Sequence, residues 1–306
     1  MADIHVGTPR SYRYAPAWNE NWTTARGQIV DSEPDLLLVG GDLTRDGATH
    51  RYELDQIKAD LDRLPFPYYV VPGNHEVGNK QIPNTIDSQR LFKSVSVNEE
   101  YLSHYASVFG GSEWSFLHKD VRFTGFNTFL LGSELPQERL LWDWLELQAK
   151  EPKTGFHVWV MHQSLFMDRP DEPNIDVHAD RAGWYFNIDN PHRSRLLEIF
   201  KATKADLVIS GHIHCRREVG YQGIRLYFAP ATAFPQVADR WYDGDPTLGF
   251  TLCEVSSDAI TPNFIPLNRL STIQGYGPGG NPDHALRDYS IATKRPTLEE
   301  MGQAPH

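Results

Sequence analysis

Cysteine is nearly absent from this chain of 306 residues, which contains only Cys215 and Cys253. Two cysteines do not make the dense disulfide framework that holds small secreted domains together. We therefore expect two buried free thiols, each packing as a small apolar side chain. Reduced thiols are typical of the cytoplasm, so the cysteine content favours a cytoplasmic location.

Basic residues are also scarce, because 29 Lys and Arg face 40 Asp and Glu and the formal net charge is -11. Proteins that grip the nucleic-acid backbone normally present a basic face, so we expect no nucleic-acid-binding patch. A small anionic substrate is not excluded, since a bound cation reverses the local field. No apolar run approaches the ~20 residues that span a bilayer. Residues 1–30 lack the basic start and apolar core of a signal peptide, and we expect no membrane partner.

Several catalytic signatures are missing from the sequence. It contains no GxxxxGK[ST], GxSxG, HExxH or CxxC pattern. Each of these patterns supplies a physical part of a mechanism, such as a phosphate cradle, an exposed nucleophile or a pair of zinc ligands. Interpretations as a P-loop, α/β-hydrolase, metalloprotease or zinc-ribbon protein therefore lack their working parts.

Short apolar runs rich in β-formers alternate with helical patterns, which is typical of an α/β or layered mixed fold. The expected strands cover residues 36–39, 68–71, 158–161 and 207–209. The expected helices cover residues 54–64 and 138–149, and a third begins at Asn190-Pro191. Glycine, proline and charge dominate the end of the chain. We expect one domain over residues 1–267 and a loosely attached segment over 268–306.

Each expected strand leads directly into polar side chains. The runs DLLLV, PYYVV, HVWVM and DLVIS are followed by Gly-Gly-Asp42, Pro-Gly-Asn74-His75, His162 and Gly-His212-Ile-His214. In open α/β sheets, ligands gather at the carboxyl ends of strands, where turns direct side chains toward a shared crevice. A lone histidine after a strand is more often a hydrogen-bonded structural residue. Four strand ends that repeat the arrangement favour a metal site of oxygen and imidazole donors, suited to Mn, Fe or Zn.

Five blocks together resemble the calcineurin-like metallophosphoesterase superfamily, in order and in rough spacing. They are Asp3-x-His5, GDLTRDG (41–47), GNHE (73–76), His162 and GHIH (211–214). The resemblance implies an α/β fold that is a four-layer sandwich, with two mixed β-sheets packed face to face and flanked by helices. It also implies two divalent metal ions at the strand ends. By this likeness Asp3, His5, Asp42 and His214 hold one metal, and a bridging Asp42 holds the other with Asn74, His162 and His212.

Three features depart from relatives of this superfamily. Purple acid phosphatases have glycine where His5 stands and a tyrosine ligand after the GD motif, and neither holds here. Arg45-Asp46 stands where protein phosphatases have Asp-Arg, so no phosphate-binding arginine is expected at this point. The superfamily also places a hydrophobic strand before Asp-x-His. We expect that strand to be missing before Asp3, with the segment ordered through the metals it binds.

The catalytic roles follow from the same resemblance and from general chemistry. Two divalent ions ~3.5–4 Å apart share a hydroxide that serves as the nucleophile, and Asp42 is the bridging carboxylate between them. His75 lies next to a ligand and suits a general acid for the leaving group, with Glu76 or another carboxylate orienting its ring. His104 or a metal-bound water is the alternative proton source. The expected substrate contacts are Trp184, Tyr185, Arg193 and the segment WNENW (18–22).

The sequence thus predicts a dinuclear metal-dependent phosphoester hydrolase acting on a small phosphoester. A slight preference for diesters, as in the phosphodiesterase-like branch, follows from the arginine missing in the GD block. The alternatives are a phosphomonoesterase or phosphoprotein phosphatase of the same superfamily. A non-catalytic metal-binding or interaction protein on this scaffold is the alternative of another class.

Overall fold

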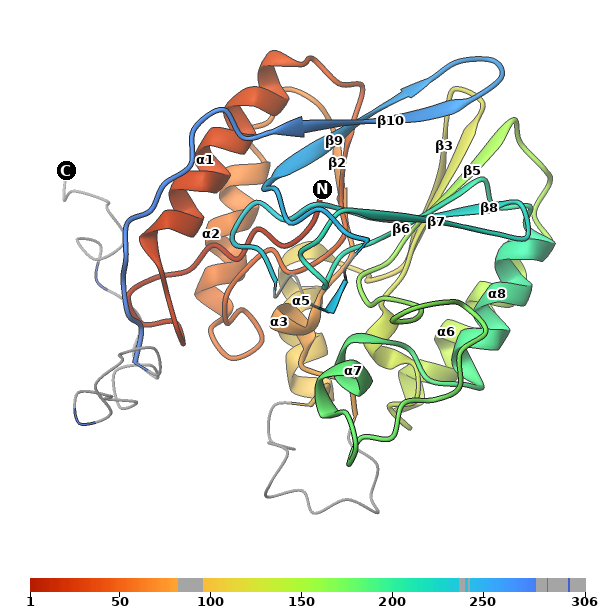
Figure 1. The fold of residues 1–306 in the computed structure, drawn as a ribbon, viewed down its shortest axis with the longest axis horizontal. Coiled ribbons are helices and arrows are strands. Elements are labelled where there is room, and N and C mark those ends of the chain that lie inside the picture. Colours follow the sequence, from red (N-terminus) through yellow and green to blue (C-terminus); the bar gives the residue numbers. More distant parts are fainter. Residues whose placement is uncertain (82–95, 237–239, 242, 279–284, 286–296, 298–306) are drawn as a thin grey trace.

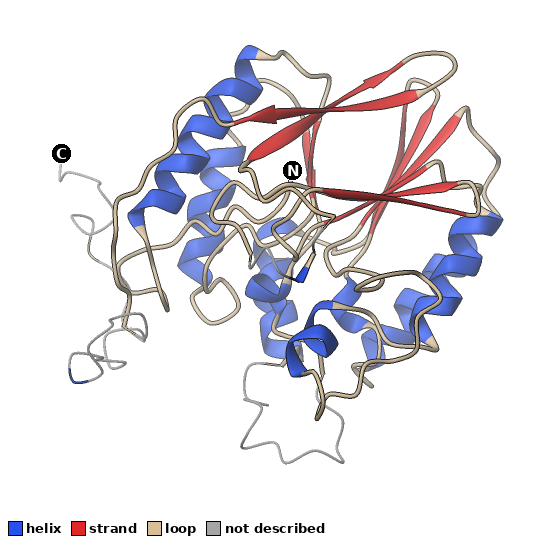
Figure 2. Cartoon of the chain, viewed as in Figure 1, coloured by secondary structure: helices blue, strands red, loops and turns tan. Residues whose placement is uncertain are grey.

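Strands of two layers lie between two groups of helices in the computed structural model (Figures 1 and 2). The structure describes residues 1–81, 96–236, 240–241 and 243–278, together with residues 285 and 297. The predicted C-terminal segment 268–306 therefore lies largely outside the described residues. Within them, every helix is too short or too polar to cross a membrane.

A mixed six-stranded sheet forms one of the two layers, in the order β3-β4-β5-β6-β8-β7. The four central strands are parallel to one another, and β3 and β7 pair antiparallel at the two edges. The strands are β3 (Trp114–His118), β4 (Val121–Gly125), β5 (Phe156–Val160), β6 (Leu207–Ser210), β7 (Arg217–Tyr221) and β8 (Ile224–Phe228). Parallel strands align their carboxyl ends, so β5 and β6 deliver the residues after them to the same edge.

The facing layer consists of two strand pairs joined through the first residues of the chain. In it β1 (Leu37–Val39) pairs parallel with β2 (Tyr68–Val70), and β9 (Gly249–Val255) pairs antiparallel with β10 (Ile260–Pro266). Between them, the Gly40 amide donates to the Met1 carbonyl (2.9 Å) and Ala2 forms a parallel bridge with Ala231. Residues 1–6 are buried without forming a regular strand. A cavity of about 570 Å³ lies beside Met1, between the layers.

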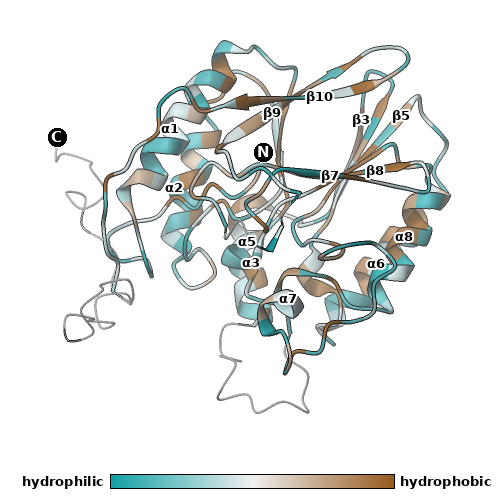
Figure 3. Ribbon diagram, in the orientation of Figure 1, coloured by the Kyte–Doolittle hydropathy of each residue, from teal (hydrophilic) through white to brown (hydrophobic). Residues whose placement is uncertain are grey.

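Helices cover the outer face of each layer. The N-terminal half contributes α1 (Pro16–Asp31), α2 (Arg51–Leu61), α3 (Asn74–Val77) and α5 (Glu99–Phe109), and the C-terminal half α6 (Pro136–Gln148), α7 (Arg181–Phe186) and α8 (His192–Ala202). A 3-10 turn covers Thr128–Leu130. In Figure 3, α6 and α8 carry both brown and teal stretches, as expected of helices with one buried face.

Three apolar clusters separate the layers. One packs α6 and α8 on the six-stranded sheet through Leu145, Trp159 and Phe200, and another packs α1 and α2 on β1 and β2. The third lies between the two strand layers and includes Val158, Ile209 and Tyr227. Helix, sheet, sheet and helix are thus four layers, and the predicted α/β sandwich is confirmed, with its second sheet in two separate strand pairs.

The expected strands and helices agree closely with the observed ones. Residues 36–39, 68–71, 158–161 and 207–209 correspond to β1, β2, β5 and β6, and the three expected helices correspond to α2, α6 and α8. The prediction of two buried thiols is wrong for one of them. Cys215 is buried, but Cys253 is exposed because it lies in β9, where only the first residues of the strand are covered.

Candidate metal centre

The residues singled out in the sequence meet at the carboxyl ends of the strands. Asp42 follows β1, Asn74 begins α3 after β2, and His162 follows β5. His212 and His214 follow β6. Parallel pairing of β1 with β2 and of β5 with β6 brings these ends together from both layers. The structure therefore assembles from distant segments the cluster that the strand-end pattern predicted.

Two glycines let the strand ends approach one another. Gly41 has a φ of +88°, and a Cβ there would lie 2.4 Å from His162 Nδ1. A Cβ on Gly73 would lie 2.1 Å from Asp42 Oδ1. Both distances are far below van der Waals contact, so any larger residue would displace the side chain that it meets. These glycines are required for Asp42 and His162 to share one site.

Five of the clustered residues adopt a backbone conformation that is unusual for residues with a Cβ. Their φ angles are 57° for Asp3, 49° for His5, 51° for Asp42, 71° for His212 and 49° for His214. Such left-handed conformations are uncommon outside glycine and cost of order 1–3 kcal/mol each. Their concentration at one place is typical of a functional site held by its surroundings.

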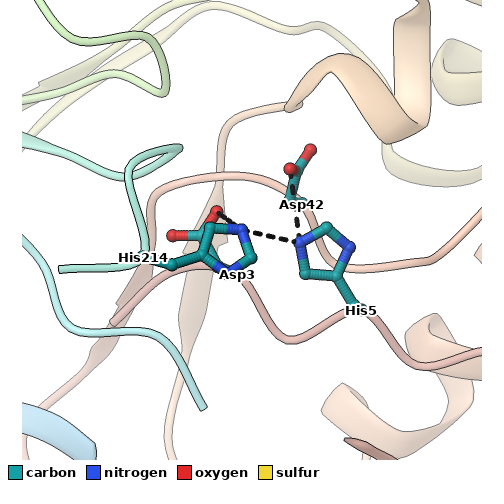
Figure 4. A group of neighbouring side chains, drawn as sticks. All are labelled: Asp3, His5, Asp42 and His214. Atoms are coloured by element: carbon teal, nitrogen blue, oxygen red, sulfur yellow. Dashed lines mark hydrogen bonds and ion pairs between the residues drawn. The ribbon is translucent and has the colours of Figure 1, made fainter. Parts of the chain in front are cut away.

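One group of four side chains can hold a cation. The ligand atoms of Asp3, His5, Asp42 and His214 all lie within 4.8 Å of one another, and all four residues are buried (Figure 4). His5 Nε2 is 3.1 Å from His214 Nε2 and 3.5 Å from Asp42 Oδ2. His214 Nε2 is 3.4 Å from Asp3 Oδ1. Two imidazoles and two carboxylates therefore converge on one small volume.

A second group shares Asp42 with the first. Asp42, His162 and His212 place their ligand atoms within 4.8 Å, and His162 Nε2 is 3.3 Å from Asp42 Oδ2. Asn74 is linked to this group through Tyr185, whose ring centroid lies 5.0 Å from that of His212. The Asn74 Nδ2 donates to the Tyr185 hydroxyl (2.8 Å) and to Asn79 Oδ1 (3.0 Å). With the amide nitrogen so fixed, the Asn74 Oδ1 is the atom left to accept or to ligate.

Hydrogen bonds to backbone carbonyls fix the rings of two histidines. His162 Nδ1 lies 2.6 Å from the Gly40 carbonyl, and His214 Nδ1 lies 2.8 Å from the Phe234 carbonyl. A carbonyl can only accept, so Nδ1 carries a hydrogen, and Nε2 turns a lone pair to the cluster whenever the ring is neutral. Among the described residues, buried atoms without a hydrogen-bond partner include Asn74 Oδ1, His162 Nε2 and His212 Nε2. Unpaired acceptors converging in this way fit metal ions.

The electrostatics of the cluster also favour cations. Burial opposes ionisation of Asp42, but the surrounding histidines, His162 foremost, hold its carboxyl pKa well below the ordinary value. Burial, together with the nearby Asp42, raises the pKa of Asp3 well above its ordinary value. Burial likewise opposes the charged form of His162, yet Asp42 outweighs it and raises the pKa to about 9. The buried carboxylates thus draw positive charge into the site.

His75 lies at the edge of the cluster rather than inside it. Its Nε2 is 3.9 Å from Asp42 Oδ2, and its Nδ1 bonds to the Arg45 carbonyl. Glu76 does not orient this ring, contrary to our expectation. Its carboxylate accepts from the Thr44 amide (2.8 Å) and the Gly73 amide (2.8 Å), which ties together the two loops that carry Asp42 and Asn74. The backbone of Arg45 orients His75 instead.

The residues expected to contact substrate lie in different places. Tyr185 in α7 reaches the cluster, with its ring centroid 5.0 Å from that of His212. Trp184 is buried beside Lys80, whose Nζ lies 4.4 Å from its ring, and both line a cavity of about 300 Å³. In the segment 18–22, Trp18 lies 6.3 Å from the His5 ring.

Arg193 lies inside the protein and away from the cluster. It is fully buried, its Nη1 is 3.5 Å from Glu172 Oε1, and its Nη2 donates to the Glu172 carbonyl. Both terminal nitrogens are engaged within the fold, which does not fit the predicted contact with phosphate. The cation that does lie beside the cluster is Arg45, which the sequence patterns did not suggest. Its guanidinium covers the Trp18 ring at 5.3 Å.

Two facing sheets with histidine, aspartate and asparagine side chains gathered at the strand ends are the arrangement expected of a metallophosphoesterase. The chain belongs to the calcineurin-like phosphoesterase family, whose model matches residues 1–216. The family is hydrolytic, so the resemblance and the enzyme class predicted from the sequence are confirmed.

Two relatives of this chain are named for different activities. The chain is 25% identical over 287 residues to the serine/threonine-protein phosphatase CPPED1 of Danio rerio, covering 88% of this chain and 84% of that one. It is also 25% identical over 265 residues to a probable cyclic nucleotide phosphodiesterase of Psychrobacter sp. (strain PRwf-1), covering 85% and 70%.

Solved structures with similar folds include a dimetal phosphatase from Danio rerio, with a TM-score of 0.54, 13% identity and coverage of 90% of this chain and 98% of that one. GAP50, the anchor in the inner membrane complex of Plasmodium, gives a TM-score of 0.56 at 13% identity, with coverage of 99% and 94%. At such low identity these likenesses concern the fold alone.

Proposed function

We propose that this protein is a phosphoester hydrolase that works with two divalent metal ions. The observation that carries the proposal is the pair of buried ligand groups that share Asp42. A carboxylate common to two groups is a short tether, suited to hold two cations close together. Family membership supports the reaction class, and the unpaired acceptor atoms support the metal sites.

The donor set assigns the ligands to two sites. One site would use Asp3, His5, Asp42 and His214, and the other Asp42, Asn74, His162 and His212. When bound, the two cations supply Lewis acidity at the phosphoryl oxygens and an activated water as nucleophile. Imidazole, carboxylate and amide donors without a thiolate favour Mn, Fe or Zn.

The remaining chemistry falls to side chains at the rim. As the bond between phosphorus and the leaving oxygen breaks, that oxygen gains negative charge and needs a proton. His75 is the candidate donor, because its Nε2 faces Asp42 from outside both ligand groups. Tyr185, held by the Asn74 amide, provides an apolar wall with a polar tip beside His212.

Two substrate classes are supported by different observations. Aromatic rings flank the cluster on both sides, with Trp18 and Phe234 beside His5 and Tyr185 beside His212. They suit the flat leaving group of a nucleoside-like diester, in line with the preference from the sequence and with the Psychrobacter relative's name. The position of Arg45 supports a monoester instead, because a dianion gains more from a cation. The Danio rerio relative is named a protein phosphatase.

Three further points stay predictions from the sequence. They are a cytoplasmic location, the absence of a nucleic-acid partner, and the division into a domain over residues 1–267 and a C-terminal segment over 268–306. The cytoplasmic location rests on the two free thiols and the nucleic-acid prediction on the net charge of -11.

The test is the variant Asp42→Asn. The matched control is Asp55→Asn, at an exposed position of α2. After loading with Mn, the wild-type protein should contain close to two metal equivalents and hydrolyse bis-p-nitrophenyl phosphate or p-nitrophenyl phosphate. Asp42→Asn should lose most of the metal and nearly all turnover, while Asp55→Asn matches the wild type. Normal turnover in Asp42→Asn would refute the proposal. A wild-type protein that binds at most one equivalent and hydrolyses neither ester would instead be a non-catalytic member of the family.

A further inference from the structure

Beside the candidate metal centre lies a cationic side chain, Arg45, that forms no ion pair with a carboxylate of the described residues. Arg45 follows Asp42 by three residues, and its carbonyl accepts from His75 Nδ1. Its Cζ lies 5.3 Å from the centroid of the Trp18 ring, which in turn lies 6.3 Å from the His5 ring. Burial is the main cause of the lowered pKa of His5, and the charge of Arg45 contributes to it. The guanidinium is thus electrostatically coupled to the centre.

The terminal nitrogens of this guanidinium are available. Within the part of the chain that the structure describes, Arg45 Nε donates to the Tyr12 carbonyl (2.8 Å), and neither Nη1 nor Nη2 has a hydrogen-bond or ion-pair partner. Two other basic side chains discussed above are already paired: Arg193 with Glu172 in the core, and Lys80, whose Nζ is 2.6 Å from Asp189 Oδ2. Arg45 therefore has two terminal nitrogens that no described residue binds by a hydrogen bond or an ion pair.

The loops around Arg45 hold it in place. Fully buried Glu53 accepts from Ser11 Oγ (2.5 Å) and from the Asp46 amide (2.7 Å), and Asp46 in turn accepts from the Tyr12 amide. These bonds tie the segment around residue 12 to the segment around residue 46. Because Tyr12 anchors the Nε of Arg45, the fork is positioned before any ligand arrives, which lowers the entropic cost of binding.

We infer that Arg45 binds the phosphoryl group of the substrate through Nη1 and Nη2, and that it favours phosphomonoesters over phosphodiesters. An arginine fork matches two oxygens of a phosphoryl group, and hydrogen bonds between ions are stronger than neutral ones. A monoester is a dianion near neutral pH, whereas a diester is a monoanion, so the same cation gains more from the monoester. The inference rests on the proposed function and names the residue that selects among its substrates.

The test compares Arg45→Gln and Arg45→Lys with Arg63→Gln, which removes the same charge from a highly exposed position. Binding of inorganic phosphate to the Mn-loaded protein is measured by calorimetry, independently of turnover. Arg45→Gln should weaken phosphate binding roughly 10- to 100-fold, the usual worth of a charged hydrogen bond. It should lower kcat/KM for phenyl phosphate by a similar factor and for bis-p-nitrophenyl phosphate by less. Arg45→Lys should recover part of the loss, since it keeps the charge without the fork.

Each outcome bears on the inference. Phosphate affinity unchanged in Arg45→Gln, or reduced equally in Arg63→Gln, would overturn it. Equal losses on the monoester and the diester would overturn the selectivity. Loss of metal from both Arg45 variants would also overturn it, because Arg45 would then support the loop of His75 rather than the substrate. If the wild-type protein hydrolyses no phosphoester, the proposed function fails, while the phosphate titration still decides the role of Arg45.

Discussion

Replacing His75 by asparagine separates proton transfer from metal binding. His75 Nε2 is 3.9 Å from Asp42 Oδ2, farther than the nitrogens of His162 (3.3 Å) and His5 (3.5 Å), and it belongs to neither ligand group. His75→Asn should therefore keep the metal content of the wild type. Loss of the Nδ1 bond to the Arg45 carbonyl should cost about 1 kcal/mol of stability, which leaves the protein folded.

The size of the rate loss follows from the state of the proton. Since Nδ1 must donate to a carbonyl, Nε2 can donate only in the imidazolium form. Burial lowers the pKa of His75 to about 4. A bound anionic phosphoryl group favours the imidazolium form, whereas the two cations of the proposed centre would oppose it. Losing this acid should slow turnover by roughly 10²–10⁴.

The assay uses two leaving groups and a metal analysis. The loss in His75→Asn should be large for an alkyl phosphoester, whose alkoxide needs a proton, and small for a p-nitrophenyl ester, whose phenolate does not. His212→Ala, as the contrasting variant, should lose metal and activity together for both esters. Equal losses on both esters in His75→Asn, or a missing metal equivalent, would show that His75 is not the acid.

Two other residues give predictions about stability. Arg193→Met leaves Glu172 buried without its cation, so the free energy of unfolding should fall by about 3 kcal/mol while kcat/KM stays near the wild-type value. A fall in kcat/KM at unchanged stability would favour a substrate contact. Burial lowers the pKa of His157 to about 4. The unfolded chain therefore binds more protons below about pH 6.5, and stability is lost as the pH falls from there toward 4, by at most about 3 kcal/mol. Urea unfolding at several pH values should show a weaker pH dependence in His157→Gln. An unchanged dependence would contradict this.

The candidate ligands could be found in the sequence because their positions depend on local rules. A strand of buried β-formers must end, the turn after it needs glycine, and the next side chain then faces the crevice. Gly41 before Asp42 and Gly73 before Asn74 follow this rule, and the structure gives both glycines a steric reason. The strands themselves were equally visible, because fully buried strands appear as continuous apolar runs.

Side chains whose role depends on their partners could not be assigned in this way. Arg193 and Arg45 are both arginines close in sequence to candidate site residues, yet Glu172 draws one into the core and the Tyr12 carbonyl holds the other at the rim. The role of Glu76 could not be assigned from the sequence either, because its carboxylate joins two loops that are separated by about thirty positions in the chain. Such contacts exist only after the two sheets have packed.

The backbone conformation of the centre has to be held in place by the bonds around it. Five residues with positive φ, at about 1–3 kcal/mol each, amount to roughly 5–15 kcal/mol, which is comparable to the whole stability of an ordinary domain. The backbone keeps this conformation because other bonds oppose its relaxation. The His212 amide donates to both carboxylate oxygens of Asp3 at 3.1 Å. The Asp3 amide donates to the Gly41 carbonyl (3.0 Å), and the Ile4 amide donates to the Asp42 carbonyl (2.8 Å). The bonds that hold the first residues of the chain in place are therefore also the bonds that orient the candidate ligands Asp3 and His5.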